Sequence, residues 1–124
     1  MGANIKDKIL KLKKEKNAVI LAHYYQPGEI QGLADYVGDS YYLSEKARDC
    51  SENVIMFCGV RFMAESAKIL SPQKRVLMPC PSAGCAMADM ASSKAVAEMK
   101  EKYPEALVVC YINSTYKVKA QCDV

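Results

Sequence analysis

The stretch NAVILAHYY, residues 17–25, is a short apolar run centred on Val19, Ile20 and Leu21, with polar residues at both ends. Such a run is typical of a strand in a parallel sheet that is covered on both faces. Three further stretches share the pattern: NVIMFCGV at 53–60, RVLMP at 75–79 and EALVVCYIN at 105–113. Together the four runs predict a four-stranded parallel sheet.

Helical patterns fill the segments between these runs. GEIQGLADYV and YYLSEKARDC lie in the first connection, FMAESAKIL in the second, and SSKAVAEMKEKY, with Ser92 or Ser93 as its cap, in the third. An amphipathic helix is also expected over the lysine-rich residues 6–17. The alternation of strands and helices predicts a three-layer α/β/α sandwich, and a chain of 124 residues suits one domain over 1–124.

The charge of the chain is concentrated at its start. Residues 6–17 hold most of the lysines behind the formal net charge of +3, which indicates a solvated helix face and no nucleic-acid surface. The sequence has no apolar stretch near the ~20 residues of a membrane span, and its start lacks the apolar core of a secretion signal. We therefore expect a cytoplasmic protein with no nucleic-acid or membrane partner.

Two of the six cysteines stand apart from the others. Cys58 and Cys110 lie inside apolar runs, where reduced, buried thiols are usual. Cys80 and Cys85 lie instead in the turn PCPSAGCAMADM, residues 79–90. Their spacing fits neither a zinc knuckle nor a ferredoxin run. This leaves open a structural turn, a redox-active dithiol, or a single ligand of a cluster that is completed elsewhere.

Polar residues follow each predicted strand. Because the carboxyl ends of parallel strands meet at one edge of a sheet, where ligands bind, these residues are expected to share a rim. They are His23 with Tyr25, Gly59, the Cys80–Cys85 turn, and Tyr111 with Asn113. His23, the single histidine, can bind a carboxylate or relay a proton.

Asp39 and Ser40 follow a glycine just before a helical pattern. The local interpretation is a helix cap. A serine hydroxyl beside the first amide groups of a helix can equally hold an anionic group of a substrate.

Five stretches, taken in order and spacing, resemble the amino-terminal domain of quinolinate synthase: HYYQ, GDSYYLS, CGVRFMAESAKILSP, AGCAMADM and YINSTYKVKA. The resemblance covers the chain from about residue 5. It implies a transferase of NAD biosynthesis that condenses iminoaspartate with dihydroxyacetone phosphate to form quinolinate, with loss of water and phosphate. The implied fold has three similar α/β domains around a pseudo-threefold axis.

The resemblance also implies roles for individual residues. Each domain of the family gives one cysteine to a central [4Fe-4S] cluster that acts as a Lewis acid, and the cysteine of the AGC turn is Cys85 here. His23 and Ser40 would bind a substrate carboxylate, and Tyr25 would act as a proton donor or acceptor. Tyr111 and Asn113 would line the same pocket. Cys80, held between two prolines, is interpreted as structural.

The other two cluster cysteines of the family lie outside this sequence. We therefore expect the chain to need the remaining domains of the enzyme as partners, to be inactive alone, and to self-associate through its exposed rim. Two alternatives remain: a non-catalytic α/β binding module that keeps the fold, and a small redox protein that uses Cys80 and Cys85 as a dithiol.

Overall fold

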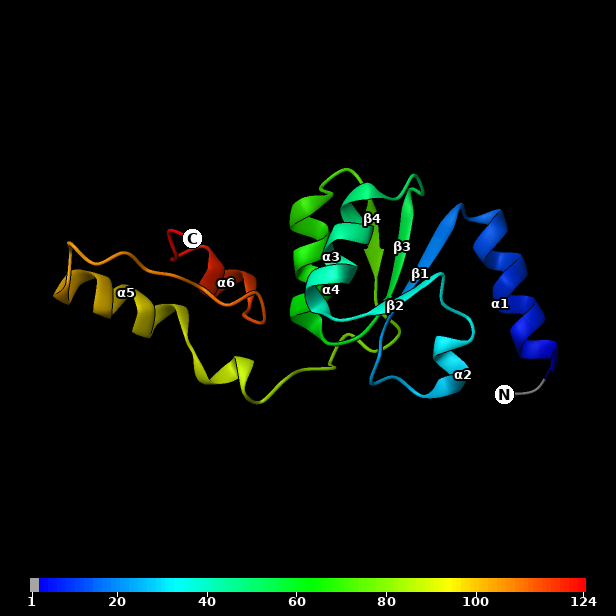
Figure 1. The fold of residues 1–124 in the computed structure, drawn as a ribbon, viewed down its shortest axis with the longest axis horizontal. Helices are drawn as coiled ribbons and strands as arrows, with labels where there is room; N and C mark the ends of the chain where they lie inside the picture. The colour runs from blue at the N-terminus through cyan, green and yellow to red at the C-terminus, as the bar shows by residue number, and fades with distance from the viewer. Residues whose placement is uncertain (1–2) are drawn as a thin grey trace.

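The computed structural model describes residues 3–124 and shows a parallel sheet with helices on both faces (Figure 1). Helices α1 and α2 cover one face, and α3 and α4 cover the other. The predicted fold class, a three-layer α/β/α sandwich with four parallel strands, is confirmed. Across the sheet the strands lie in the order β2-β1-β3-β4. The strands are β1 (Ala18–His23), β2 (Tyr36–Gly38), β3 (Val54–Cys58) and β4 (Arg75–Leu77). The helices that cover them are α1 (Ala3–Glu15), α2 (Gly28–Gln31), α3 (Ser40–Asp49) and α4 (Arg61–Leu70).

The identity of the fourth strand differs from the prediction. Residues 36–38 form the edge strand β2 beside β1, although the predicted helical pattern had included residues 36 and 37. Asp35 fixes this edge, because its backbone N–H donates to the Ile20 carbonyl at 2.9 Å and its Oδ2 accepts from the Ile20 N–H at 2.9 Å. These bonds end the helical pattern after the short helix α2.

Residues 105–113 do not join the sheet, so the strand predicted there is wrong. Leu107 and Val109, at its centre, are 70% and 68% exposed. The segment pairs instead with the last residues of the chain, since the Cys110 N–H donates to the Val124 carbonyl at 2.7 Å and the Asp123 N–H donates to Val108 at 2.9 Å. The segment is apolar, as a buried strand would be, but within residues 3–124 no face of the sheet covers its side chains.

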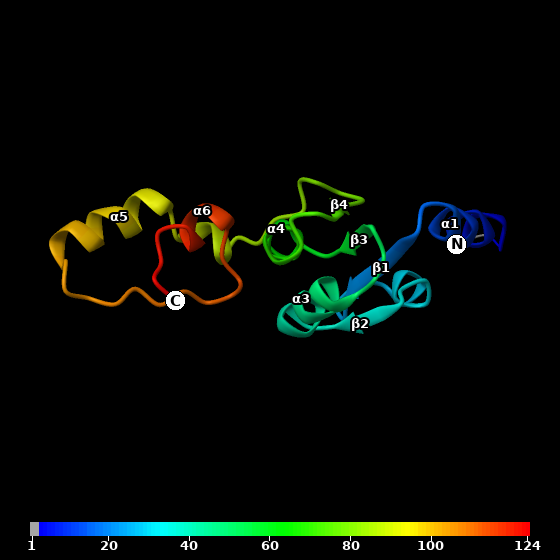
Figure 2. The same cartoon turned by 90° about the horizontal axis from the view of Figure 1, so that it is seen from above.

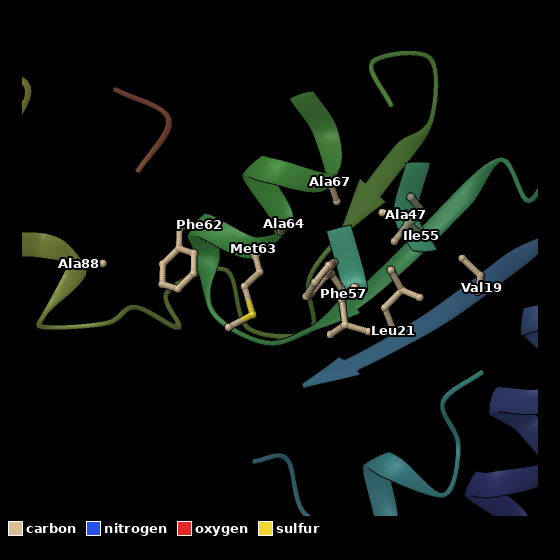
Figure 3. Close-up of a cluster of buried hydrophobic side chains, with 11 residues drawn as sticks. Val19, Leu21, Ala47, Ile55, Phe57, Phe62, Met63, Ala64, Ala67 and Ala88 are labelled. Carbon is tan, nitrogen blue, oxygen red and sulfur yellow. The ribbon is translucent and has the colours of Figure 1, made fainter. Parts of the chain in front are cut away.

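The main core lies between the sheet and the helices α3 and α4 (Figure 3). Alternate residues of β1 point to opposite faces, as strand geometry requires. Leu21 therefore packs with Phe57 and Leu43 on the α3–α4 side, and all three side chains are fully buried. Ile20 faces the other way, toward Ile9 of α1. Burial on both faces explains the continuous apolar run in β1.

The residues after β4 extend beyond α4, away from the sheet, in both views (Figures 1 and 2). They form η1 (Ala88–Met90), α5 (Ser93–Lys102) and α6 (Tyr116–Lys119). Ser92 caps α5 by accepting from the Ala95 N–H, as predicted, but α5 buries none of its residues. None of the helices within residues 3–124 combines the length and apolar character that a bilayer span requires.

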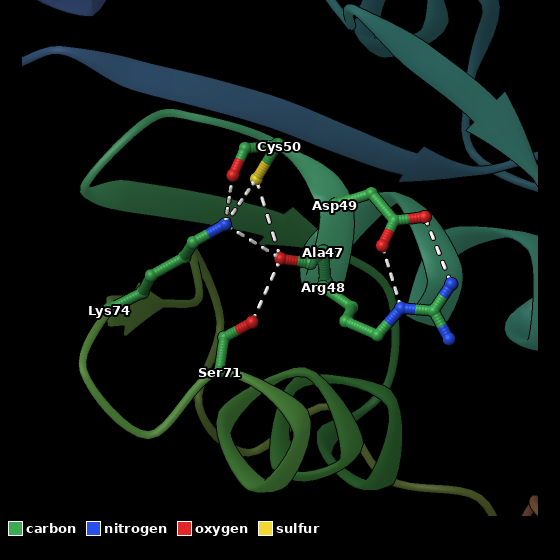
Figure 4. Close-up of polar contacts among 6 residues, drawn as sticks. All are labelled: Ala47, Arg48, Asp49, Cys50, Ser71 and Lys74. Carbon is green, nitrogen blue, oxygen red and sulfur yellow. Dashed lines mark hydrogen bonds and ion pairs between the residues drawn. The ribbon is translucent and has the colours of Figure 1, made fainter.

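A buried lysine ties the end of α3 to the turn before β4 (Figure 4). Lys74 is 6% exposed, and its Nζ donates to the Ala47 carbonyl at 3.0 Å, to the Cys50 carbonyl, and to Cys50 Sγ at 3.0 Å. Ser71 Oγ donates to the same Ala47 carbonyl at 3.0 Å. The last carbonyls of a helix lack intrahelical partners, and Lys74 and Ser71 supply the missing hydrogen-bond donors at the end of α3.

We predict that Lys74→Met lowers the free energy of unfolding by about 1–3 kcal/mol, because the Cys50 carbonyl loses its donor inside the protein. Urea denaturation followed by circular dichroism measures this change. Lys94→Met is the matched control, since Lys94 is 87% exposed and forms only a surface pair. Equal stability of the two variants would contradict a structural role for Lys74.

Candidate active site

The carboxyl end of β1 brings His23 against the two tyrosines that follow it. His23 is 6% exposed, and its ring lies 3.9 Å from that of Tyr25 and 4.4 Å from that of Tyr24, centroid to centroid. The Tyr25 backbone N–H donates to His23 Nδ1 at 3.4 Å. The proton of the neutral imidazole is therefore assigned to Nε2. His23 can donate from Nε2 to a substrate oxygen.

Burial lowers the pKa of His23 below its ordinary value, because the imidazolium loses hydration. The nearby Asp39 carboxylate opposes this shift. The ring is thus mainly neutral at neutral pH and gains a proton more readily when a further anion binds beside it.

Gln31 of α2 fixes the turn that carries the tyrosines. Its Nε2 donates to the Tyr24 carbonyl at 2.9 Å and to the Gln26 carbonyl at 2.7 Å. Gln31 was not among the predicted site residues, since a glutamine in a helical pattern gives no local signal of such a contact.

The end of β2 places Ser40 beside β1, because Gly38 is the register partner of His23. Asp39 caps α3 by accepting from the Tyr42 N–H at 2.8 Å, which confirms the cap interpretation. Ser40, the first residue of α3, is 7% exposed. Gly38 permits this arrangement, since a Cβ there would lie 2.3 Å from the Tyr42 ring.

Tyr25 lies within electrostatic reach of Cys85. Burial raises the pKa of the Tyr25 phenol, and a negative charge on the Cys85 thiol raises it further, whereas the backbone N–H of Val60 acts against the rise. The phenol therefore stays protonated at neutral pH and can act as a proton donor.

Cys85 borders a cavity of about 240 Å³ at the beginning of α4. Its side chain is half-buried and packs against the main core. The turn before it is held to α4 by the Arg61 N–H, which donates to the Ala83 carbonyl at 2.8 Å. The Asp89 N–H donates to the Cys85 carbonyl at 3.0 Å. The thiol is thus held on a fixed turn and faces an open space.

The other cysteines behave differently. Cys80 is exposed, and its thiol pKa is lowered by a hydrogen bond with Ser82, whose Oγ lies 3.4 Å from Cys80 Sγ. Cys58 is buried, as predicted, and burial raises its pKa. Cys110 is only half-buried, so the expected full burial of that thiol is wrong. Within residues 3–124, no three His, Cys, Asp or Glu side chains converge as metal ligands.

Tyr111 and Asn113 do not follow a strand of the sheet, contrary to the prediction. They lie in the 111–115 loop, which leads into α6, and Asn113 Nδ2 donates to the Tyr111 hydroxyl at 3.4 Å. Among the described residues, no hydrogen bond or ring contact joins this pair to His23 or Tyr25. Asn113 Oδ1 is buried without a hydrogen-bond partner, so it can still accept from a ligand.

Thr115, at the end of the 111–115 loop, lines the same cavity as Cys85, whereas His23, Tyr25 and Ser40 do not line it. Arg61 and Glu65 of α4 line this cavity as well. The sequence analysis gave these two residues no role, since they lie inside an ordinary amphipathic helix.

Comparison with known proteins gives the same assignment as the sequence motifs. Residues 7–124 match the family described as "Quinolinate synthetase A protein". The chain is 69% identical over 124 residues to the quinolinate synthase of Clostridioides difficile (strain 630), covering all of this chain and 41% of that relative. It is 59% identical over 120 residues to the quinolinate synthase of Caldicellulosiruptor saccharolyticus, covering 97% of this chain and 40% of that relative.

The chain thus spans about two fifths of the length of these curated relatives, 40–41%. The family match covers nearly the whole chain, and the identities to these relatives are high. The chain belongs to the quinolinate synthase family.

Proposed function

We propose that this chain forms the part of a quinolinate synthase that binds a substrate carboxylate, supplies a proton donor, and contributes one thiolate to a [4Fe-4S] cluster. The complete enzyme would condense iminoaspartate with dihydroxyacetone phosphate to quinolinate. The observation that carries the proposal is the packing of the Tyr25 ring against the buried His23 ring at the carboxyl end of β1, with the two ring centroids 3.9 Å apart. The other domains of the same enzyme are the partners this implies.

His23 and Ser40 are proposed to bind a carboxylate of iminoaspartate. His23 Nε2 offers an N–H, and the Ser40 hydroxyl lies at the first turn of α3, two residues after the register partner of His23. Both side chains are buried, so a hydrogen bond from either one competes less with water. Carboxylate binding favours a proton on the imidazole, because the anion stabilises its charged form.

Tyr25 is proposed to donate a proton from its hydroxyl to a substrate oxygen. Elimination of water requires protonation of the leaving oxygen, and a phenol with a raised pKa holds its proton until that point. Stacking on His23 fixes the orientation of the ring. Asn113 Oδ1, a buried acceptor without a partner, would take a hydrogen bond from a substrate N–H or hydroxyl.

Cys85 fits a ligand of a shared cluster. Its half-buried thiol lies on a fixed turn beside a cavity of about 240 Å³, and residues 3–124 contain no complete metal site. The cluster, when bound, supplies an iron that accepts a substrate oxygen as a Lewis acid. Its remaining ligands would come from the rest of the enzyme. A cytoplasmic location belongs to the same proposal, since all six cysteines are free thiols.

In the complete enzyme, we predict that Cys85→Ser abolishes cluster binding, because a serine hydroxyl does not replace a thiolate on iron. Iron and acid-labile sulfide analysis after anaerobic purification measures the cluster. Cys80→Ser and Cys110→Ser serve as controls and are expected to retain full iron content. Full iron and sulfide in the Cys85 variant would overturn the assignment.

We predict that Tyr25→Phe in the complete enzyme lowers kcat by about 10²–10⁴-fold, the usual contribution of a positioned proton-transfer group. Substrate affinity should weaken by only about 1 kcal/mol, the value of one neutral hydrogen bond. Tyr24→Phe is the matched control, since the Tyr24 ring also lies against His23 and the two tyrosines are similarly exposed, 62% for Tyr24 and 51% for Tyr25. A kcat for Tyr25→Phe within a few-fold of the control would leave Tyr25 only a packing role.

The pKa of His23 in this chain is predicted to lie below 6.5 and to rise when a dicarboxylate binds. Binding is therefore coupled to proton uptake, and affinity for the dicarboxylate should increase as the pH falls toward the His23 pKa. His23 is the single histidine, so its NMR titration with and without succinate needs no assignment. A pKa above 6.5 in the free chain, or one that succinate leaves unchanged, argues against this role.

A further inference from the structure

Glu65, on the exposed side of α4, uses its two carboxylate oxygens to join segments that are distant in sequence. Oε1 accepts from Arg61 Nε at 3.1 Å, one turn earlier in the same helix. Oε2 accepts from the backbone N–H of Tyr116 at 3.0 Å, across 51 residues of sequence. The Glu65 side chain is 17% exposed, whereas its partners Arg61 and Tyr116 lie at the surface, 67% and 46% exposed.

The bond to Tyr116 satisfies an amide that α6 itself leaves unpaired. Tyr116 is the first residue of α6, and the first amides of a helix have no intrahelical acceptor. Thr115 caps the Val118 N–H, and Glu65 takes the Tyr116 N–H. An ionised acceptor makes this hydrogen bond stronger than a neutral one.

The neighbouring residue of α4 holds the other end of α6. Lys119 Nζ donates to Ser66 Oγ at 2.6 Å, and the Ser66 hydroxyl donates in turn to the Phe62 carbonyl at 2.9 Å. Burial lowers the pKa of Lys119, whereas Cys110 and Glu65 act in the opposite direction. Two adjacent residues of α4 thus fix both ends of the four-residue helix α6.

The position of α6 sets the position of the 111–115 loop, because Asn113 lies only three residues before Tyr116. The same helix α4 is bound at its first residue to the turn before Cys85, through the Arg61 N–H and the Ala83 carbonyl. The Cys85 turn and the end of the 111–115 loop, which both border the cavity, are therefore held by the same helix. Glu65 is the charged side chain of α4 that binds the residue directly after this loop, Tyr116.

We propose that Glu65 is a positioning residue, which holds the 111–115 loop so that Tyr111 and Asn113 can bind substrate. The substrate role of this loop rests on the proposed function, but the positioning can be measured without it. Removal of the carboxylate should release the loop and α6 while leaving the sheet intact, because the core of the sandwich lies on the other side of α4.

Hydrogen exchange on this chain tests the positioning directly. Glu65→Ala should increase amide exchange in residues 111–119 by about tenfold or more, with β1 and β3 unchanged. Glu65→Gln retains a carbonyl acceptor and should recover part of the protection. Glu98→Ala is the matched control, since Glu98 pairs with Lys94 one turn earlier, as Glu65 does with Arg61, but binds no distant amide. Unchanged exchange in residues 111–119 of Glu65→Ala would overturn the proposal.

Steady-state kinetics of a complete quinolinate synthase carrying this sequence test the consequence for substrate. Glu65→Ala should raise KM by about tenfold or more with a smaller change in kcat, and Glu65→Gln should lie between that variant and the unsubstituted enzyme. An unchanged KM despite faster exchange shows that the loop does not bind substrate, which rejects the proposed consequence. Absence of quinolinate formation by the unsubstituted enzyme refutes the proposed function and leaves the exchange result standing.

Discussion

The arrangement of this chain depends on the packing of α4 between the sheet and the residues that follow β4. On one side, Phe62, Met63 and Ala67 of α4 enter the main core. On the other side, Glu65 and Ser66 hold α6. Burial of the apolar face fixes the rotation of α4 about its axis, and this rotation directs the polar face toward α6 and the cavity beside Cys85. Displacement of α4 would separate Cys85 from the 111–115 loop.

Most of the sandwich could be predicted, because strands that are buried on both faces have continuous apolar sequences. The apolar runs of β1 and β3 need partners on both faces, and the runs at 17–25 and 53–60 identified them. The sequence pattern did not predict β2, because β2 is an edge strand of three residues whose central Val37 is 37% exposed. Residues 105–113 show the limit of this signal. An apolar run indicates that a segment can be buried, but it does not specify which surface covers the segment.

The residues of the candidate site likewise differ in whether the local sequence gives a signal of their position. His23 ends β1 and Tyr25 follows it closely, so the strand pattern placed both at the rim, whereas the local sequence left several roles open for Cys85 and its role as a cluster ligand rests on the family resemblance. Gln31 and Glu65 act through single hydrogen bonds to distant backbone groups, and such bonds leave no periodic or spacing signal. Tyr111 and Asn113 are hydrogen-bonded to each other, but the strand that was expected to place them on the rim does not form.

The charges near the site bear on how the proposed substrate would be bound. A dicarboxylate brings two negative charges, whereas His23 is mainly neutral in the free chain and Tyr25 keeps its proton. The one cation that lines the cavity beside Cys85, within residues 3–124, is Arg61, and Glu65 already pairs with it. Neutral donors can orient a carboxylate, but a second carboxylate still requires positive charge. On the proposed function, that charge would come from other parts of the enzyme, whereas His23, Ser40 and Tyr25 of this chain would orient the substrate.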